Sequence, residues 1–252
     1  MIRLVRVNAG KLVRPPVAGN APGAVAFAWR ACNRGWSMTD DDLARKRRTM
    51  VEAQLKPRGI RDPRVLEAMA TVPRERFVDD RAQPYAYDDG PLPIGRQQTI
   101  SQPYVVALML ELAAPGPDDR VLEVGAGSGY VVAVAARLAR EVVGIERHAD
   151  LAHEAQARLT ALGVENARVV AGDGTDGLAE AAPFDAVVIS AGAEEVPEAL
   201  MSQLAVGGRL VVPVGGPGFQ LLERVVREPD GGFSCSTHGG VAFVPLVGDR
   251  PG

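Results

Sequence analysis

Short runs of valine, isoleucine and leucine alternate with helical stretches through the middle of the chain. The runs that we predict to be strands cover residues 120–124, 141–145, 167–171, 184–190 and 208–214. Helices are expected between them, near residues 129–139, 149–162 and 194–204. Strands this apolar are typical of a parallel sheet that helices cover on both faces. The alternation therefore predicts an α/β fold around a mostly parallel central sheet.

The segments that flank this alternation follow other patterns. Thr39 and Asp42 form a capping box that opens a helix ending at Gly59, and Asp62-Pro63 opens a second helix, so an N-terminal helical segment is expected. Residues 78–104 contain four prolines and are expected to form a long ordered loop with a functional reason to exist. Two C-terminal runs are expected to be antiparallel edge strands, and they cover residues 221–227 and 240–247.

Charge is distributed unevenly along the chain. Residues 1–37 hold six basic and no acidic side chains, whereas the remainder holds 22 basic and 31 acidic ones. We favour a disordered N-terminal extension over residues 1–37, translated from upstream of a natural start at Met38, and a single domain over residues 38–252. A basic arm for nucleic acid or acidic lipid and a targeting peptide stay open as alternatives for the extension. The acidic domain does not favour a nucleic-acid partner.

Cysteine and histidine usage bears on the compartment and on metals. The chain has only Cys32 and Cys235, which cannot make a disulfide framework, and its three histidines are not spaced as metal ligands. The apolar run at residues 24–29 is too short for a signal-peptide core or a membrane span. We therefore expect an intracellular, cytoplasmic protein without a metal site or a membrane partner.

A glycine-rich turn follows the first predicted strand of the sheet. It reads Gly125-Ala126-Gly127-Ser128-Gly129, and Tyr130 stands where the dinucleotide fingerprint has its third glycine. Glu123 precedes the turn, and its carboxylate suits an ammonium group better than a pyrophosphate. The turn therefore fits the methionine end of S-adenosylmethionine better than NAD. A tight strand-to-helix turn without a ligand is the alternative.

Acidic residues also stand at the ends of the next two predicted strands. Glu146 lies 21 positions after Gly125, where a carboxylate can accept hydrogen bonds from both ribose hydroxyls. Asp173, followed by Gly174, could accept from an adenine amino group. Their alternatives are a solvated charge for Glu146 and a turn residue for Asp173. Because ligands bind beyond the carboxyl ends of strands in open sheets, the set predicts a nucleoside-cofactor site.

Several blocks of the chain resemble the protein-L-isoaspartate (D-aspartate) O-methyltransferase family, over roughly residues 40–248. The blocks are VPRERFV at 72–78, PLPIG at 91–95, QTISQPY at 98–104, GGRLVVPVG at 207–215 and FVPLVG at 243–248. The Thr-Ile-Ser-Gln-Pro block is the specific one, because generic methyltransferases lack it. The resemblance implies a Rossmann-like S-adenosylmethionine-dependent methyltransferase that acts on isoaspartyl-containing proteins and peptides. It also implies that Ser101 is catalytic and that Thr99 and Ile100 lie beside the cofactor.

The implied reaction needs little acid–base assistance. The methyl acceptor would be a side-chain-like carboxylate, which is already ionised at about pH 7 and can attack a sulfonium methyl group without a general base. The protein must mainly hold the two groups in line and exclude water. We expect Ser101 to orient the carboxylate by a hydrogen bond. Its alternative role is to cap the helix predicted from about residue 104, and both roles could hold at once.

Three functions are compatible with these patterns. The first is methyl esterification of L-isoaspartyl, and also D-aspartyl, residues in damaged proteins, which starts repair through a succinimide. The second is a related methyltransferase that acts on an aspartate of one dedicated biosynthetic peptide. The third is a non-catalytic S-adenosylmethionine-binding module, against which the intact Thr99–Gln102 block argues.

Overall fold

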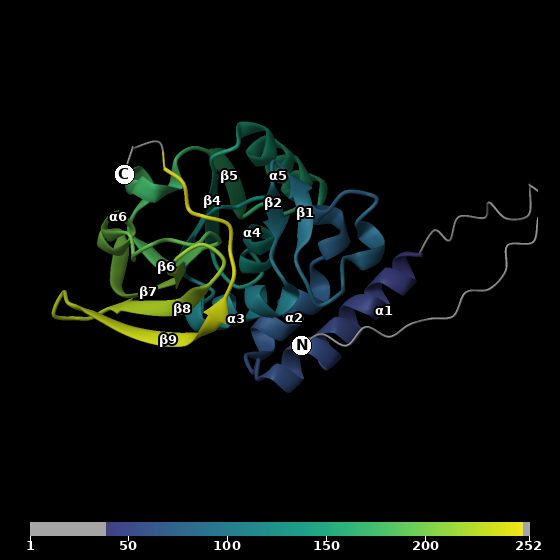
Figure 1. Ribbon diagram of the computed structural model, residues 1–252, viewed down its shortest axis with the longest axis horizontal. Helices are drawn as coiled ribbons and strands as arrows, with labels where there is room; N and C mark the ends of the chain where they lie inside the picture. The colour runs from purple at the N-terminus through teal and green to yellow at the C-terminus, as the bar shows by residue number, and fades with distance from the viewer. Residues whose placement is uncertain (1–38, 249–252) are drawn as a thin grey trace, which may run out of the picture. The chain divides into compact units, whose positions relative to one another are not determined.

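The computed structural model describes residues 39–248, which are built around a seven-stranded sheet (Figure 1). Its strands are β3 (Arg120–Val124), β4 (Glu141–Glu146), β5 (Ala167–Ala171), β6 (Phe184–Ile189), β7 (Leu204–Val214), β8 (Gln220–Arg227) and β9 (Phe233–Val241). They lie in the order β5-β4-β3-β6-β7-β8-β9. The first five are parallel to one another, and β8 and β9 run antiparallel at one edge. This arrangement confirms the predicted mostly parallel sheet with antiparallel C-terminal strands.

Helices cover both faces of the sheet, as the apolar strands predicted. The helices α3 (Pro103–Ala113), α4 (Tyr130–Ala135) and α5 (Ala149–Ala161) pack in one hydrophobic core, and α6 (Glu198–Ser202) packs in the other. Successive residues of β6 alternate between the two cores. Ala186 and Val188 belong to the first, and Val187 and Ile189 belong to the second. A strand buried on both faces has no polar side, which explains its continuous apolar sequence.

The N-terminal helices begin where their capping residues predict. Thr39 and Asp42 form the capping box of α1 (Asp40–Met50), which continues through a π-helical turn at Val51–Leu55. The helical segment stops at Gly59, whose φ of 100° is favourable only without a side chain. Asp62 caps α2 (Pro63–Thr71) by accepting a hydrogen bond from the Arg64 amide. Both predicted helix starts are confirmed.

The expected N-terminal extension at residues 1–37 lies outside the described residues. The division of the chain into this extension and a domain over residues 38–252 therefore stays a prediction. Within residues 39–248, no helix has the length and apolar character needed to span a membrane.

We expected a long ordered loop over residues 78–104, but this segment contains a β-hairpin. The antiparallel strands β1 (Leu92–Gly95) and β2 (Gln98–Ile100) follow a 3₁₀ turn at Gln83–Tyr85. Arg96 and Gln97 form the hairpin turn with φ values of 50° and 59°. Tight hairpin turns need positive φ, which sequences usually signal with Asn-Gly or Asp-Gly. The absence of that signal here explains why the hairpin was not predicted.

The last predicted strand was placed too far along the chain. We expected it at residues 240–247, whereas β9 ends at Val241 and the following residues leave the sheet. The β9 strand is exposed along nearly its whole length, so it shows no alternation of apolar and polar residues. The apolar run that suggested a strand belongs instead to the yellow segment after β9 in Figure 1, at residues 242–248.

Arg74 connects the segment before the β1–β2 hairpin to α4, the helix that follows the glycine turn. Its side chain is fully buried, and its Nε donates a hydrogen bond of 2.7 Å to the Ala86 carbonyl. Its guanidinium lies 5.1 Å from the centre of the Tyr130 ring. Burial lowers the pKa of Arg74 to about 10, so the side chain stays charged at neutral pH. These contacts explain the structural role of the VPRERFV block at residues 72–78: its Arg74 fixes the segment that leads into the hairpin.

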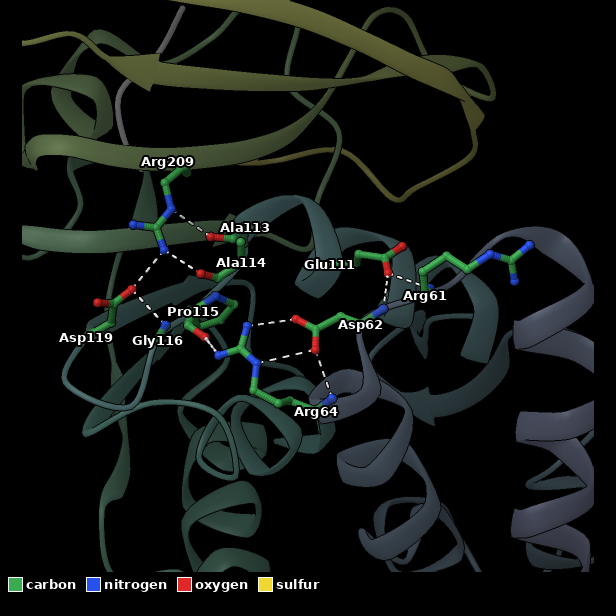
Figure 2. Close-up of polar contacts among 10 residues, drawn as sticks. All are labelled: Arg61, Asp62, Arg64, Glu111, Ala113, Ala114, Pro115, Gly116, Asp119 and Arg209. Carbon is green, nitrogen blue, oxygen red and sulfur yellow. Dashed lines mark hydrogen bonds and ion pairs between the residues drawn. The ribbon is translucent and has the colours of Figure 1, made fainter.

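Arg209 on β7 fixes the carboxyl-terminal end of α3 (Figure 2). Its Nε donates to the Ala113 carbonyl at 2.9 Å, and its Nη2 donates to the Ala114 carbonyl at 2.6 Å and to Asp119 at 2.8 Å. Carbonyl groups at a helix end have no partner within the helix, and a cation there also interacts favourably with the helix dipole. Arg209 therefore anchors α3 against the sheet.

A second contact in Figure 2 anchors α3 to α2. One carboxylate oxygen of Glu111 accepts hydrogen bonds from the amides of Arg61 and Asp62, each at 2.6 Å. Arg64, in the first turn of α2, reaches the Pro115 carbonyl at 2.9 Å. Because α3 starts two residues after Ser101, contacts that hold α3 also position Ser101.

We expect Arg209→Met to lower the free energy of unfolding by about 2 kcal/mol, because it removes three hydrogen bonds from a half-buried group. Denaturant unfolding monitored by circular dichroism measures this loss. Arg45→Met is the control of equal charge, since Arg45 makes only a solvent-exposed ion pair with Asp42 and its loss should change the free energy of unfolding much less. Equal losses in the two variants would contradict the anchoring role.

Candidate active site

The glycine turn joins the end of β3 to the start of α4. Gly125, Gly127 and Gly129 have φ values of 83°, 52° and 89°, a region that side chains disfavour. The amides of Gly125 and Ala126 donate to the Ile145 carbonyl at 2.9 Å and 3.0 Å, so the turn is fixed to the end of β4. The predicted spacing of glycines is therefore required by the backbone of the turn itself.

Glu123 is a buried carboxyl group beside this turn. Its side chain is 1% exposed, and its Oε1 accepts a hydrogen bond of 3.0 Å from the Ser190 hydroxyl. Its Oε2 is buried and has no hydrogen-bond partner among residues 39–248. Burial raises the pKa of Glu123 well above its usual range, the charge of Glu146 adds to the rise, and the Ser190 hydrogen bond opposes it. An unpartnered buried oxygen costs free energy unless a ligand supplies a donor.

Glu146 ends β4 on the opposite side of the turn. It is 5% exposed, and it accepts hydrogen bonds from the Gly127 amide at 2.9 Å and the His148 amide at 3.0 Å. The alternative interpretation of Glu146 as a solvated charge is therefore wrong. The two backbone donors hold one carboxylate oxygen each and fix the plane of the group.

Asp173 caps the short 3₁₀ turn Gly174–Asp176 at the end of β5. Its Oδ1 accepts from the Thr175 amide at 2.9 Å and the Thr175 hydroxyl at 2.7 Å. This geometry agrees with the turn interpretation, and the role toward adenine stays a prediction. Gly174 follows directly, and a Cβ there would be 2.5 Å from Val124 Cγ1. A glycine is therefore needed for this 3₁₀ turn to pack against Val124 at the end of β3.

The β1–β2 hairpin brings three predicted site residues to the same edge of the sheet. Ile100 is 4% exposed and packs in the core, whereas Thr99 is exposed on the other side of β2. Ser101 follows directly and is half-buried. The helix α3 takes Gln102 as its N-cap, without a side-chain hydrogen bond. The expectation that Ser101 caps this helix is therefore wrong, since the helix starts one residue later than that role requires.

Three cavities meet at the residues of this edge. One of about 120 Å³ lies between Gly125, Glu146 and Gly174. A second of about 30 Å³ lies along the glycine turn beside Glu123, and a third of about 540 Å³ opens on the far side of Ser101.

The shared lining shows where these cavities join. Thr99 and Ser190 line all three, and Ser101 lines the second and the third. The predicted residues around the turn are thus brought together with the hairpin, whereas Asp173 is not among the residues that line the first cavity. Ser190 was missed by sequence reasoning, and its only signal was its position at the end of a strand next to β3.

The C-terminal segment forms a wall of the site that the sequence did not predict. The Gly192 amide donates to the Val244 carbonyl at 2.8 Å, and the Leu246 amide donates to the Gly192 carbonyl at 2.7 Å. Val244 lines both the first and the third cavity, and Pro245, Leu246 and Val247 line the first. The apolar run at residues 242–248 therefore covers two of the cavities, and it makes one isolated parallel bridge, between Pro245 and Gly192, where we expected a strand.

Comparisons with known proteins agree with this geometry. The family model for protein-L-isoaspartate(D-aspartate) O-methyltransferase matches residues 45–251. A protein-L-isoaspartate O-methyltransferase from Methylorubrum extorquens is 56% identical over 206 residues, which is 82% of this chain and 90% of that protein. The enzyme of the same name from Pelotomaculum thermopropionicum is 52% identical over 216 residues, covering 86% of this chain and 94% of its own.

Solved structures show the same architecture. A Plasmodium falciparum chain described as a protein-L-isoaspartate O-methyltransferase, in complex with S-adenosyl-L-homocysteine, superposes with a TM-score of 0.69 at 28% identity. The match covers 80% of this chain and 98% of that one. Another protein-L-isoaspartate O-methyltransferase superposes with a TM-score of 0.72 at 29% identity, over 80% of this chain and 66% of its own. The chain therefore belongs to the protein-L-isoaspartate(D-aspartate) O-methyltransferase family.

Proposed function

We propose that the protein is an S-adenosylmethionine-dependent methyltransferase that esterifies the free carboxylate of L-isoaspartyl residues in damaged proteins and peptides. D-aspartyl residues are proposed as further substrates. The observation that carries the proposal is the junction of the cavities at Thr99, Ser101 and Ser190. A methyl donor in the inner cavities and a carboxylate in the outer cavity would meet at that junction.

The residues around the inner cavities fit S-adenosylmethionine. The unpartnered Oε2 of Glu123 can accept a hydrogen bond from an ammonium group, and the glycine turn leaves its backbone open beside it. Glu146, fixed by two amides, still has lone pairs for the hydroxyls of a ribose. When bound, this cofactor supplies an electrophilic methyl group on a sulfonium ion.

The remaining chemistry depends on position. The carboxylate that accepts the methyl group is ionised at neutral pH, so the site needs no general base. Ser101 lines the outer cavity and the cavity beside Glu123, which supports a role in which its hydroxyl donates a hydrogen bond to one oxygen of that carboxylate and leaves the other oxygen to attack. Thr99 and Val244 line both the first and the third cavity, and a cofactor and a substrate that fill these cavities would exclude water from the reacting groups. The methyl ester can then collapse to a succinimide, which reopens in part to aspartate.

A cytoplasmic location is part of the proposal. Cys235 is exposed and is a free thiol, which is typical of proteins in a reducing compartment.

Matched peptides test the proposed substrate. We expect label from methyl-labelled S-adenosylmethionine to appear in a peptide that contains L-isoaspartate. The same peptide with L-aspartate should stay unlabelled, because the free carboxylate of aspartate is bonded to Cβ, whereas that of isoaspartate is bonded directly to Cα. Methylation of the aspartate peptide alone would refute repair and favour a methyltransferase for a dedicated peptide. Binding of S-adenosylhomocysteine without transfer to either peptide would favour a non-catalytic module.

Two substitutions separate the roles within the site. We expect Ser101→Ala to lower kcat for the isoaspartyl peptide about tenfold or more, because it removes a hydrogen bond to a charged group. Calorimetry should show an unchanged Kd for S-adenosylhomocysteine. Glu146→Ala is the opposite control, and it should raise that Kd about tenfold through loss of the ribose contacts. An unchanged kcat in Ser101→Ala would remove Ser101 from the mechanism, and an unchanged Kd in Glu146→Ala would refute the ribose role.

A further inference from the structure

The outer cavity is larger than one carboxylate requires. Its volume of about 540 Å³ lies within the range of cavities that enclose whole small ligands, roughly 300–1,000 Å³. In the proposed function, a peptide substrate brings neighbouring residues along with its isoaspartyl side chain. The outer part of the cavity therefore has room for those neighbours.

Large apolar side chains line part of this cavity, beside polar ones that include Gln102 and His238. Tyr104 and Leu108 project from α3, and Phe219, Val241 and Phe243 come from the C-terminal strands and the segments next to them. Phe219 is 63% exposed, although an aromatic ring of this size usually contributes to a core or an interface.

The charge at the rim of the cavity is already compensated within the protein. The guanidinium of Arg58 lies 3.1 Å from both carboxylate oxygens of Asp89 and 3.6 Å from the centre of the Tyr104 ring. An acidic neighbour in the substrate would therefore compete with Asp89 for Arg58. This arrangement favours an apolar neighbour over an acidic one.

The position of the Phe219 ring is defined by its surroundings. A Cβ on Gly240 would lie 2.8 Å from Phe219 Cε2 and 3.2 Å from Cζ, so the ring rests directly on the glycine backbone. The next residue, Gln220, is 2% exposed, and both the nitrogen and the oxygen of its side-chain amide make hydrogen bonds. It donates to the Gly216 carbonyl at 2.8 Å and accepts from the Phe243 amide at 2.8 Å. The ring is thus an exposed apolar surface held at the cavity rim.

We propose that Phe219, seated on Gly240, determines substrate specificity by contacting an apolar side chain next to the isoaspartyl residue. This inference rests on the proposed function, because it concerns the flanking residues of the same peptide. The Phe219 contact would lower KM and would leave the transfer step unchanged, because it acts away from Ser101 and the reacting carboxylate.

Steady-state kinetics with two isoaspartyl peptides test this proposal on the full chain. One peptide carries leucine on both sides of the isoaspartate, and the other carries serine. We expect Phe219→Ala to raise KM for the leucine peptide roughly tenfold at unchanged kcat, and to leave KM for the serine peptide nearly unchanged. Gly240→Ala should raise KM for the leucine peptide in the same direction, because the new methyl group displaces the ring.

Phe233→Ala is the matched control. Phe233 is also an exposed phenylalanine, 45% accessible, but it begins β9 at the end away from the cavity. Its loss should not change the preference between the peptides. The inference is overturned if Phe219→Ala changes KM for both peptides equally or for neither. Failure of the proposed function would look different, because the unsubstituted protein would then methylate neither peptide.

Discussion

The site depends on one buried carboxyl group, that of Glu123 at the end of β3. Ser190, the residue that follows β6, donates a hydrogen bond to one of its oxygens, and the other oxygen has no donor among residues 39–248. Such a group raises the free energy of the folded protein unless something else offsets the cost, and here a cationic ligand would do so. Three features lie around this carboxyl group: the glycine turn, its amide contact to Glu146, and the end of β6. The cofactor side of the site is therefore built around a carboxyl group whose burial lowers the stability of the free protein.

Elements outside the parallel sheet provide the other side. The hairpin carries Thr99 and Ser101 to the carboxyl edge of the sheet, and α3, anchored by Arg209, holds the end of that segment. The C-terminal segment closes the opposite wall through its two hydrogen bonds with Gly192. In the proposed function, residues at the end of the sheet would bind the cofactor, and the hairpin and the C-terminal segment would determine which carboxylate reaches the junction of the cavities. This division agrees with binding residues lying on segments that a rigid scaffold positions.

Sequence reasoning found the features that local chemistry encodes. Strands that are buried on both faces can be predicted from their apolar runs. The spacing of the glycines at 125, 127 and 129 likewise predicts a turn with positive φ values. The hairpin was missed because Arg96 and Gln97 adopt positive φ without the usual turn residues. The segment at residues 242–248 was taken for a strand because an apolar run does not reveal whether it covers a sheet or a ligand cavity. Ser190 was missed because its partner, Glu123, is distant in sequence and adjacent only in the folded sheet.

Proton release on cofactor binding tests the role of Glu123 most directly. Burial raises the pKa of Glu123 well above its usual range, which favours the protonated form of this carboxyl group in the free protein. An ammonium group beside Oε2 favours the ionised form and lowers that pKa, so binding should release the proton. Calorimetry of S-adenosylhomocysteine binding in buffers of different ionisation enthalpy measures the number of protons released. We expect the unsubstituted protein to release a proton on binding, and Glu123→Gln to abolish that release and to bind more weakly. Equal proton release and equal affinity in both proteins would contradict it.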